Sequence, residues 1–430
     1  MNVLLLGSGG REHALAWRLR QSPLVEKLYC APGSEAIAQE AERLDAKPTD
    51  AEALKKLCAE RKVGLVVIGP EEPLAAGVAD ALREAGVLVF GPGRAAARLE
   101  SSKTFAKEFM GRHKVPTARW ESCRTAAEAR AALAKFAGGV VVKADGLAAG
   151  KGVRVCADRD EAEAALDDIM VKRAHGEAGA SVVLEERLEG PEVSLLGLCD
   201  GKRFLPLPPA ADHKRLLDGD EGPNTGGMGV VAPSQFLSKK QLPAVLDAIV
   251  KPVLKGLAAE KLDYRGLLYF GLMMTAQGPK LLEFNCRFGD PETQSVLPLL
   301  DADLAALCEA AAKGELPSEP PLWHGAAVTV VVASEGYPAA PVAGRRITGL
   351  AEAASRPGVL VFHAGTAREE GIWRTTAGRV LGVTGVGKDV AEARQRAYAA
   401  AELIQFEGAQ YRRDIGLPVK VTRKVKAWAS

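Results

Sequence analysis

The N-terminal part of the chain alternates short apolar runs with longer amphipathic stretches. Runs at 2–6 (NVLLL), 25–31 (VEKLYCA), 64–69 (GLVVIG) and 87–91 (VLVFG) have the length and the apolar character of buried strands. Between these runs, REHALAWRLRQS, DAEALKKLCAE and residues 74–85 are predicted to be helices. Regular alternation of strand and helix predicts a parallel, doubly wound sheet.

A glycine-rich loop joins two predicted strands at 140–155, VVVKADGLAAGKGVRV. The first strand ends in Lys143, the loop contains Gly146, Gly150 and Gly152, and the following residues alternate as a strand does. Glycines allow main-chain amides to turn toward an anion, and the lysine favours a polyphosphate ligand. The spacing is not that of a Walker loop, which opens a helix. The pattern predicts a strand-loop-strand phosphate clamp, with an ordinary long hairpin as the alternative.

A second polar pattern lies on the predicted strand KLLEFNCRFGD, residues 280–290. A period of two sends Glu283, Asn285 and Arg287 to one face and Leu282, Phe284 and Cys286 to the other. Two oxygen donors on one face suit magnesium that bridges nucleotide phosphates. The arginine could hold a carboxylate through two parallel hydrogen bonds. The alternative is a half-exposed strand with a salt bridge.

The remainder of the chain is predicted to contain a helix over 240–259 and, beyond the proline-rich stretch 313–325, a smaller α+β unit. Its predicted strands are AAVTVVVAS, VLVFHAG and GRVLGVTGVG, and its helix is DVAEARQRAYAAAELIQF. The fold class is therefore α/β and α+β, with several domains.

Composition excludes several classes of protein. The 430 residues include 56 Lys and Arg against 54 Asp and Glu, which gives a net charge of +2 and no basic footprint for nucleic acid. No apolar run reaches the ~18 residues of a membrane span. The seven cysteines have no CxxC spacing. The N-terminus lacks the features of a secretory signal. Small-molecule partners, no membrane and a cytoplasmic location are expected.

Two further loops carry candidate binding residues. The first strand runs into GSGGREH, whose glycines precede a predicted helix; the dinucleotide fingerprint is broken because Glu12 stands where its third glycine would be. Such a loop at a helix N-terminus still suits a phosphate monoester. The second loop, DHKRLLDGDEGPNTGGMG, offers donors from Asn224 and Thr225 and cations from His213, Lys214 and Arg215. A solvated surface loop is the alternative.

Six segments together resemble one family. They are GSGGREHALAW (7–17), GPEEPLAAG (69–77), KADGLAAGKGV (143–153), DHKR (212–215), GPNTGGMG (222–229) and EFNCRFGDPETQ (283–294). They span most of the chain and resemble the ATP-grasp ligases, in particular the glycinamide ribonucleotide synthetase (phosphoribosylamine-glycine ligase) family. The resemblance implies an N-terminal domain at 1–102, an ATP-grasp domain at 103–325 with a mobile lid at about 120–190, and a C-terminal α+β domain at 326–430.

The resemblance also implies roles for individual residues. For ATP these are Lys103, Lys143, Gly146, Gly150, Gly152, Glu185, Glu186, Leu188 and Glu192, of which Glu185 would read the adenine amino group and Glu192 would hold the ribose hydroxyls. For magnesium or manganese they are Glu283 and Asn285. For the substrates they are Gly9, Gly10, Arg11, Glu12, His13, Glu71, His213, Lys214, Arg215 and Arg287. The catalytic residues would be Arg287, Lys143, Asn224 and Thr225.

The implied reaction joins glycine to 5-phosphoribosylamine with ATP through a glycyl phosphate, in purine biosynthesis, and a monomer is expected. One alternative is another ATP-grasp ligase or carboxylase of purine metabolism. Another is a nucleotide-sensing module without catalysis. Two positions depart from the family pattern: Arg187 replaces an aromatic residue beside the adenine, and GYPAAPVAGRR replaces GYPGxY. The second departure is expected to affect the C-terminal domain and not the site.

Overall fold

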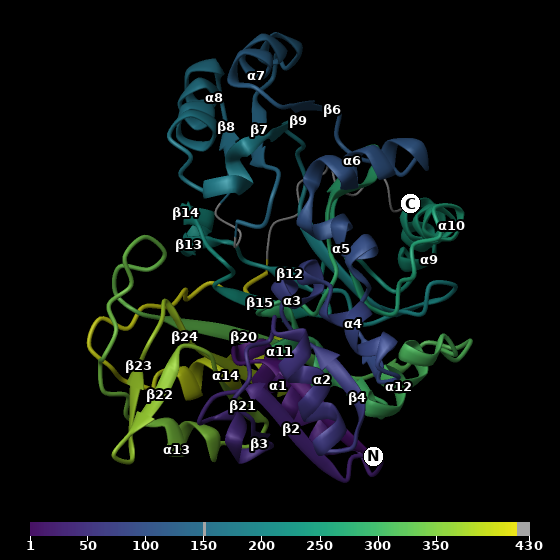
Figure 1. The fold of residues 1–430 in the computed structure, drawn as a ribbon. Coiled ribbons are helices and arrows are strands. Elements are labelled where there is room, and N and C mark those ends of the chain that lie inside the picture. The colour runs from purple at the N-terminus through teal and green to yellow at the C-terminus, as the bar shows by residue number, and fades with distance from the viewer. Residues whose placement is uncertain (149–151, 419–430) are drawn as a thin grey trace.

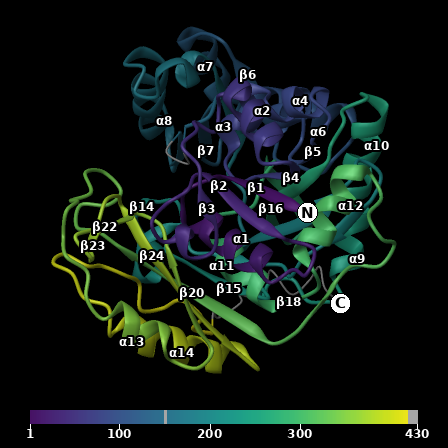
Figure 2. The ribbon, with the colours of Figure 1, turned by 60° about the horizontal axis from the view of Figure 1, so that its bottom comes forward.

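The computed structural model describes residues 1–148 and 152–418. Its N-terminal part confirms the predicted parallel sheet, with strand order β3-β2-β1-β4-β5. The strands are β1 (Asn2–Gly7), β2 (Lys27–Pro32), β3 (Glu42–Arg43), β4 (Val63–Ile68) and β5 (Leu88–Phe90), and the helices are α1 (Gly10–Arg20), α2 (Ala51–Glu60), α3 (Glu71–Ala76), α4 (Val78–Glu84) and α5 (Arg94–Ser101). Figures 1 and 2 show this unit in purple beside the N-terminus.

One predicted helix of this unit is divided in the structure. The single helix expected over 74–85 is two helices, α3 and α4, which meet at Gly77. Gly77 has φ of 85°, a left-handed conformation that ends one helix and that glycine adopts without strain. Glu71 consequently lies in the first turn of a short separate helix, directly after the end of β4.

The segment predicted to be a lid, which keeps that name here, is a four-stranded sheet in the order β6-β9-β7-β8, with its own helices. It comprises β6 (Trp120–Cys123), β7 (Val140–Ala144), β8 (Val153–Cys156), β9 (Val182–Glu186), α7 (Ala126–Ala132) and α8 (Arg159–Leu166), the last continued by a π-helical segment, Asp167–Val171. Thr125 and Asp158 cap the two helices. Its buried apolar residues form a separate cluster. Because it has its own core and stands at the top of Figure 1, the lid is built as a separate unit.

The central sheet, in the order β11-β10-β16-β17, is antiparallel. It contains β10 (Glu192–Cys199), β11 (Phe204–Pro206), β16 (Gly266–Thr275) and β17 (Gly278–Asn285), and its neighbouring helices are α6 (Lys103–Arg112), α9 (Leu242–Val245), α10 (Lys251–Ala259) and α12 (Leu304–Lys313). The turn between β16 and β17 at 276–277 confirms the predicted hairpin. Phe270 and Phe284 of this sheet share one apolar core with Leu4 and Val66 of the N-terminal sheet.

A third sheet outside the lid, β12-β15-β20-β24-β21, joins distant parts of the chain. It contains β12 (Ala211–Asp212), β15 (Gly229–Ala232), β20 (Ala326–Ala333), β21 (Val359–His363) and β24 (Arg379–Gly387), with α13 (Leu350–Ala354) and α14 (Val390–Ala401) nearby. Gly229 pairs with Val330. The two short strands that bound the loop at 213–228 are therefore held by the C-terminal strands, a long-range pairing that the local patterns did not predict.

Short elements complete the fold. They are β13 (Arg215–Leu217) with β14 (Glu221–Asn224), β18 (Leu300–Asp301) with β19 (Leu322–Trp323), β22 (Thr366–Glu369) with β23 (Ile372–Thr375), and α11 (Glu292–Val296). The helix predicted over 240–259 is seen as α9, a π-helical segment at Leu246–Val250 and α10 in succession. Within the described residues, no helix has the length and apolar character needed to cross a membrane.

Candidate active site

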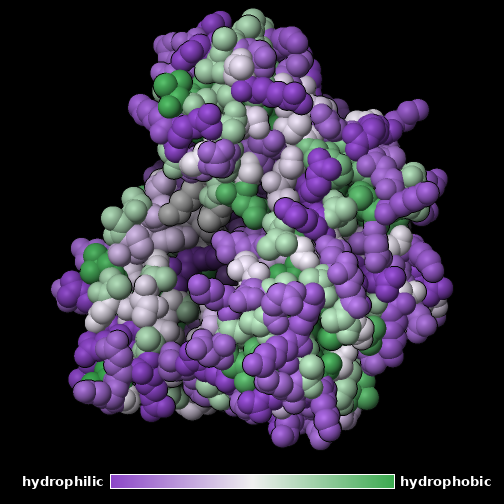
Figure 3. All heavy atoms as spheres, viewed as in Figure 1, coloured by the Kyte–Doolittle hydropathy of each residue, from purple (hydrophilic) through white to green (hydrophobic). Residues whose placement is uncertain are grey.

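A large cavity lies between the lid, the N-terminal unit and the third sheet. Its volume is about 1280 Å³, and Figure 3 shows a hollow below the lid. The predicted site residues that line it are Arg11, Glu71, Lys103, Lys143, Gly152, Glu185, Glu186, Leu188, Glu192, His213, Lys214, Arg215, Asn224, Thr225, Glu283, Asn285 and Arg287. Gly9, Gly10, Glu12, His13 and Gly146 are not among its lining residues, and Gly150 lies outside the described residues.

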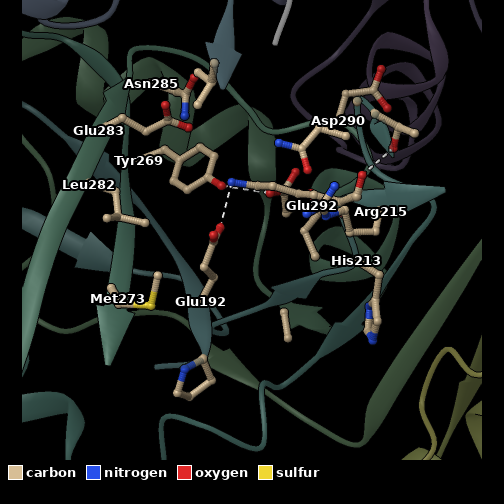
Figure 4. Close-up of a pocket in the computed structure, with 18 of the residues that line it drawn as sticks. Glu192, His213, Arg215, Tyr269, Met273, Leu282, Glu283, Asn285, Asp290 and Glu292 are labelled. Carbon is tan, nitrogen blue, oxygen red and sulfur yellow. Dashed lines mark hydrogen bonds and ion pairs between the residues drawn. The ribbon is translucent and has the colours of Figure 1, made fainter. Parts of the chain in front are cut away.

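The polar face of β17 is formed by Glu283 and Asn285, which both line the cavity (Figure 4). The register with β16 shifts here, so that Leu282 is an extra residue of β17 in a β-bulge. Leu282 therefore lines the cavity together with Glu283. The prediction that Leu282 lies on the face opposite Glu283 is therefore wrong. It assumed strict alternation along the strand, and the bulge interrupts that alternation.

Glu283 lies among positive charges. Burial alone would raise the pKa of its carboxyl, but Lys214, Lys143 and Lys103 outweigh burial and hold that pKa below its usual value. An ionised carboxylate near an amide oxygen is a donor set that suits Mg²⁺ or Mn²⁺. The described residues contain no group of three or more His, Cys, Asp or Glu that could hold a metal. A metal here would therefore depend on phosphate and water oxygens for its other ligands, as magnesium does at nucleotide sites.

A buried ion cluster lies in the part of the cavity that Lys107, Lys143 and Glu185 line. Nζ of Lys143 lies 2.7 Å from Oε1 of Glu185, and Nζ of Lys107 lies 2.9 Å from Oε2. Burial favours the neutral acid, yet the two lysines keep the pKa of Glu185 below its usual value. Both carboxylate oxygens are thus engaged by lysines. That the Glu185 side chain reads the adenine amino group stays a prediction; the structure adds Lys107 of α6 as a partner of this carboxylate.

Asp145, which directly follows β7 of the lid, connects the lid to the start of α6. Its carboxylate accepts hydrogen bonds from the main-chain N–H of Thr104 at 2.7 Å and from Oγ of Ser181 at 3.1 Å. Nζ of Lys103 donates to the carbonyl oxygen of Gly146 at 3.2 Å. Lys103 is therefore placed directly beside the beginning of the glycine-rich loop. Gly146 itself packs on Ala178, which a Cβ would approach to 2.9 Å.

Arg287 is held between two carboxylates. Its Nε donates to Oε2 of Glu71 at 3.1 Å, and its Nη2 lies 3.0 Å from Oε1 of Glu100. Its Nη1 donates to the carbonyl oxygen of Phe288 at 3.2 Å. The guanidinium is salt-bridged, as one of the two alternatives had it, and it keeps further N–H donors for a ligand. Glu100, at the end of α5, was not predicted.

The glycine loop before α1 has a structural role that the sequence did not indicate. Oε2 of Glu12 accepts a hydrogen bond of 2.7 Å from the N–H of Gly9, and Oε1 accepts one of 2.5 Å from Nε of Arg11. A Cβ at Gly7 would lie 2.5 Å from Cγ of Glu12. The glycine thus makes room for a buried carboxylate that caps the helix. Glu12 is therefore engaged within the loop and its substrate role stays a prediction, whereas Arg11 lines the cavity.

His13 belongs to a contact between the N-terminal unit and the third sheet. Its Nδ1 accepts a hydrogen bond of 2.9 Å from the main-chain N–H of His363 in β21. Burial, with His363 nearby, lowers the pKa of His13 to about 3. Gly10 packs in the same contact, because a Cβ there would lie 3.3 Å from Cβ of Ala364. Both residues thus pack against the C-terminal part of the chain, and their substrate roles stay predictions.

The DHKR segment sends its side chains in different directions. Nζ of Lys214 lies 2.8 Å from Oε2 of Glu192, so the residue predicted to hold the ribose is already paired (Figure 4). The ring of His213 points away from Glu192 and Glu283 in Figure 4, and its Nδ1 lies 3.2 Å from the carbonyl oxygen of Gly229. Lys214 is the cation of this segment that reaches the charged centre of the cavity.

The loop at 224–227 is braced internally and from the C-terminal strands. Oγ1 of Thr225 donates to the carbonyl oxygen of Lys214 at 2.9 Å and accepts from the N–H of Gly227 at 3.0 Å. Arg379 of β24 donates to the carbonyl oxygen of Gly226, and the N–H of Gly226 donates to the hydroxyl of Tyr337 at 2.9 Å. The hydroxyl of Thr225 therefore stabilises the loop and is already in use.

Comparison with known proteins covers nearly the whole chain. The N domain of phosphoribosylglycinamide synthetase matches residues 1–100, its ATP-grasp (A) domain matches residues 101–293, and its C domain matches residues 327–418. The chain belongs to the phosphoribosylglycinamide synthetase family. This membership confirms the family that the six segments indicated, together with the ATP-grasp fold.

Relatives of the phosphoribosylglycinamide synthetase family are found in bacteria and animals. The chain is 50% identical over 419 residues to the phosphoribosylamine–glycine ligase of Phenylobacterium zucineum, covering 97% of this chain and 99% of the relative. It is also 50% identical over 420 residues to the trifunctional purine biosynthetic protein adenosine-3 of Gallus gallus, with 96% of this chain covered. It spans only 42% of the length of that chicken protein.

Solved structures show the same architecture. The phosphoribosylamine–glycine ligase of Thermotoga maritima is 35% identical, with a TM-score of 0.85 over 96% of this chain and 100% of the other. The biotin carboxylase domain of Hydrogenobacter thermophilus 2-oxoglutarate carboxylase has a TM-score of 0.74 over 95% of this chain and 91% of the other, at 17% identity. The second likeness shows a shared fold alone.

Several residues that line the cavity were not predicted from the sequence, among them Glu100, Asp212, Glu292 and Arg379. Asp212 and Glu292 stand inside the DHKR and GDPETQ segments, so the motifs that define this synthetase family could have drawn attention to them. Glu100 and Arg379 lie outside the six segments, and only the fold brings them to the cavity. Arg379 is the clearest case, because it enters from a domain in which no site residue was expected.

Proposed function

We propose that the chain catalyses the ATP-dependent ligation of glycine to 5-phosphoribosylamine, with glycinamide ribonucleotide, ADP and phosphate as products. The observation that carries this proposal is the arrangement along β17. Glu283 and Asn285, followed by Arg287, offer oxygen ligands for a metal and a cation for a carboxylate at one end of the cavity. The full-length relatives named phosphoribosylamine–glycine ligase support this choice of substrates.

The nucleotide is proposed to lie between the lid and β17. Lys103 and Lys143 would bind its phosphates, and the main chain at Glu186 and Leu188 would face the base. Glu192 would receive the ribose hydroxyls once Lys214 releases it, since these two are paired here. Glu283 and Asn285 would hold Mg²⁺ or Mn²⁺, which would neutralise charge on the phosphate being transferred. Leu282 would add an apolar surface beside these ligands.

The first half of the reaction is proposed to activate glycine. Its carboxylate is a poor electrophile, so an oxygen of that carboxylate attacks the γ-phosphorus of ATP, the bond to the bridging oxygen breaks, and ADP leaves. Lys103, Lys143 and Lys214 surround Glu283 and supply positive charge to the group being transferred. Arg287, fixed by Glu71 and Glu100, aims the glycine carboxylate at the phosphorus.

The second half of the reaction needs an amine and no protein nucleophile. The nitrogen of phosphoribosylamine attacks the acyl carbon, the bond to the phosphate oxygen breaks, and the nitrogen loses a proton as the amide forms. Arg11 and Glu71 line the side of the cavity that belongs to the N-terminal unit, and we assign phosphoribosylamine to that side. Glu71 would then lie between both substrates, because it contacts Arg287 and its Oε2 is 3.8 Å from Nη1 of Arg11.

The experiment is to omit each substrate in turn. ADP release should require ATP, glycine and phosphoribosylamine together for continuous turnover, and glycinamide ribonucleotide should appear in equal amount. Bicarbonate in place of glycine should give no turnover. Turnover with bicarbonate would favour a carboxylase on the same fold, and nucleotide binding without any turnover would favour a sensing module.

A further inference from the structure

Asp212, the last residue of β12, has a carboxylate oxygen without a partner. Its Oδ1 is buried and receives no hydrogen bond in the part of the chain that the structure describes. Gly227 lies beside this oxygen, because a Cβ added to that glycine would lie 2.6 Å from Oδ1 and 2.5 Å from Cδ of Pro291. Asp212 nevertheless lines the cavity. A buried carboxylate oxygen without a donor is costly, so its retention here points to a donor that arrives with a ligand.

A second acid, Glu292, follows Pro291 and lines the same part of the cavity. Its Oε1 accepts hydrogen bonds of 2.9 Å from both Ser194 and Tyr269, which fix its position (Figure 4). Burial, and next the charge of Glu292, raise the pKa of Asp212 well above its usual value. The two acids are therefore near enough to repel each other, and a cation between them would relieve that repulsion.

The lysine and arginine side chains near Asp212 and Glu292 already form ion pairs with other acids. Nζ of Lys214 pairs with Glu192 at 2.8 Å, and Nη2 of Arg379 pairs with Asp290 at 3.2 Å. Arg287 influences Glu292 electrostatically while its own contacts are to Glu71 and Glu100. Glu292 thus lies within electrostatic range of the arginine assigned to the glycine carboxylate, and Asp212 lines the same cavity. A small zwitterion fits this distribution of charge, with its negative end at Arg287 and its positive end at the acids.

We propose that Asp212 and Glu292 form the subsite that binds the ammonium group of glycine, which rests on the function proposed above. An ammonium carries three N–H donors, so it can satisfy the buried Oδ1 of Asp212 and still bond to Glu292. A site built to hydrogen-bond a charged donor rejects analogues that lack it, because its acid is then left buried and unpaired. The subsite would therefore select an amino acid over the corresponding hydroxy acid.

The test compares glycine with glycolate, in which a hydroxyl replaces the ammonium. Binding of each is measured calorimetrically to the full chain with Mg²⁺ and a non-hydrolysable ATP analogue. Asp212→Asn should weaken glycine binding by about tenfold to a hundredfold, the range for a charge-assisted hydrogen bond. Binding of glycolate and of the ATP analogue should change by less than about twofold. Asp247→Asn, an exposed aspartate paired with Lys251, is the matched control and should leave all of these affinities unchanged.

The outcomes separate this inference from the proposed function. Unchanged glycine affinity in Asp212→Asn, or equal losses for glycine and glycolate, would overturn the ammonium subsite while the ligase activity stood. Failure of the wild type to bind glycine or turn it over would overturn the proposed function and this inference with it. If Asp212→Asn does not fold, Glu292→Gln serves as the second variant, and a glycine-to-glycolate preference equal to that of the wild type would then overturn the proposal.

Discussion

Nε of Arg287 donates a hydrogen bond of 3.1 Å to Oε2 of Glu71, and this contact joins the end of β17 to the N-terminal unit. Burial opposes the charge on Arg287, but Glu100 and Glu71 outweigh it and raise the pKa of the guanidinium above its usual value. The arginine is thus kept charged and fixed from two sides. A carboxylate substrate would meet a cation whose position is set before binding.

Arg287→Lys should raise the glycine KM by at least about tenfold and slow formation of glycyl phosphate, because an ammonium cannot bond to Glu71, Glu100 and a substrate carboxylate in one plane. The ATP affinity should change little. Separate titrations of glycine and ATP, with hydroxylamine trapping of the acyl phosphate, measure both effects. A defect confined to ATP or to phosphoribosylamine would show that Arg287 does not bind glycine. Arg374→Lys, in β23 and paired with Glu369 at 3.3 Å, is the control.

Glu283→Gln should retain the fold and lose turnover by about 10²-fold or more. The substitution keeps the size of the side chain but removes the charge that Lys214, Lys143 and Lys103 stabilise. The measurement is kcat across a titration of magnesium, with circular dichroism as the control for folding. Turnover near the wild-type rate at saturating magnesium would show that Glu283 is not a metal ligand.

Arg379 is expected to act as a positioning residue. Its Nη1 donates to the carbonyl oxygens of Gly226 and, at 2.7 Å, of Asp290, so it links two loops of the cavity. Arg379→Lys should lower kcat about tenfold by loosening both loops, while the ATP KM and the melting temperature stay close to the wild type. A matched variant, Tyr337→Phe, removes only the acceptor for the N–H of Gly226 and should have a smaller effect. Equal loss of stability and activity would indicate a purely structural role.

Acid should destabilise the contact between His13 and His363. Burial lowers the pKa of His13 to about 3 and that of His363 to about 4, from 6.5. The unfolded chain therefore binds more protons below pH 6.5, and stability present above that pH is lost as the pH falls toward the folded values. The loss approaches about 1.4 kcal/mol per pH unit for each histidine.

Urea unfolding at pH 7 and pH 5.5 measures this effect. His13→Asn keeps an acceptor for the N–H of His363 but does not titrate, so its free energy of unfolding should fall less between the two pH values than that of the wild type. The same fall in both proteins would mean that His13 contributes nothing to the pH dependence.

Local sequence patterns were enough to predict those elements whose structure is determined by residues close together in the sequence. The strands around Leu4 and Val66, the lid hairpin that starts at Val140, and the polar face of Glu283 and Asn285 all follow from periodicity and turn residues. The third sheet could not be predicted in this way. Its pairing of Gly229 with Val330 joins segments that are far apart in the sequence, and no local period records which distant strand is the partner.

A site residue could be predicted from its motif where its side chain faces the cavity. The prediction was less successful where the side chain is buried and bonds to another residue of the protein. Glu12 and His13 belong to a segment that suggests phosphate binding, yet they cap α1 and contact β21. Glu185 follows an apolar run that enters the cleft, but Lys107 and Lys143 occupy its carboxylate. Partner choice of this kind depends on which side chains the fold brings together, and a single sequence does not specify it.

The most direct test of glycine activation by ATP is to follow the oxygen atoms of the glycine carboxylate. If the glycine carboxylate attacks ATP, one of its two oxygens must leave with the phosphate when phosphoribosylamine displaces it. The measurement is mass spectrometry of inorganic phosphate after turnover with glycine labelled by ¹⁸O in both carboxylate positions. Activation of glycine by phosphoryl transfer predicts one ¹⁸O in each phosphate released and one in the glycinamide ribonucleotide. Phosphate free of label, with ATP consumed and glycine incorporated, would contradict activation of glycine by phosphoryl transfer.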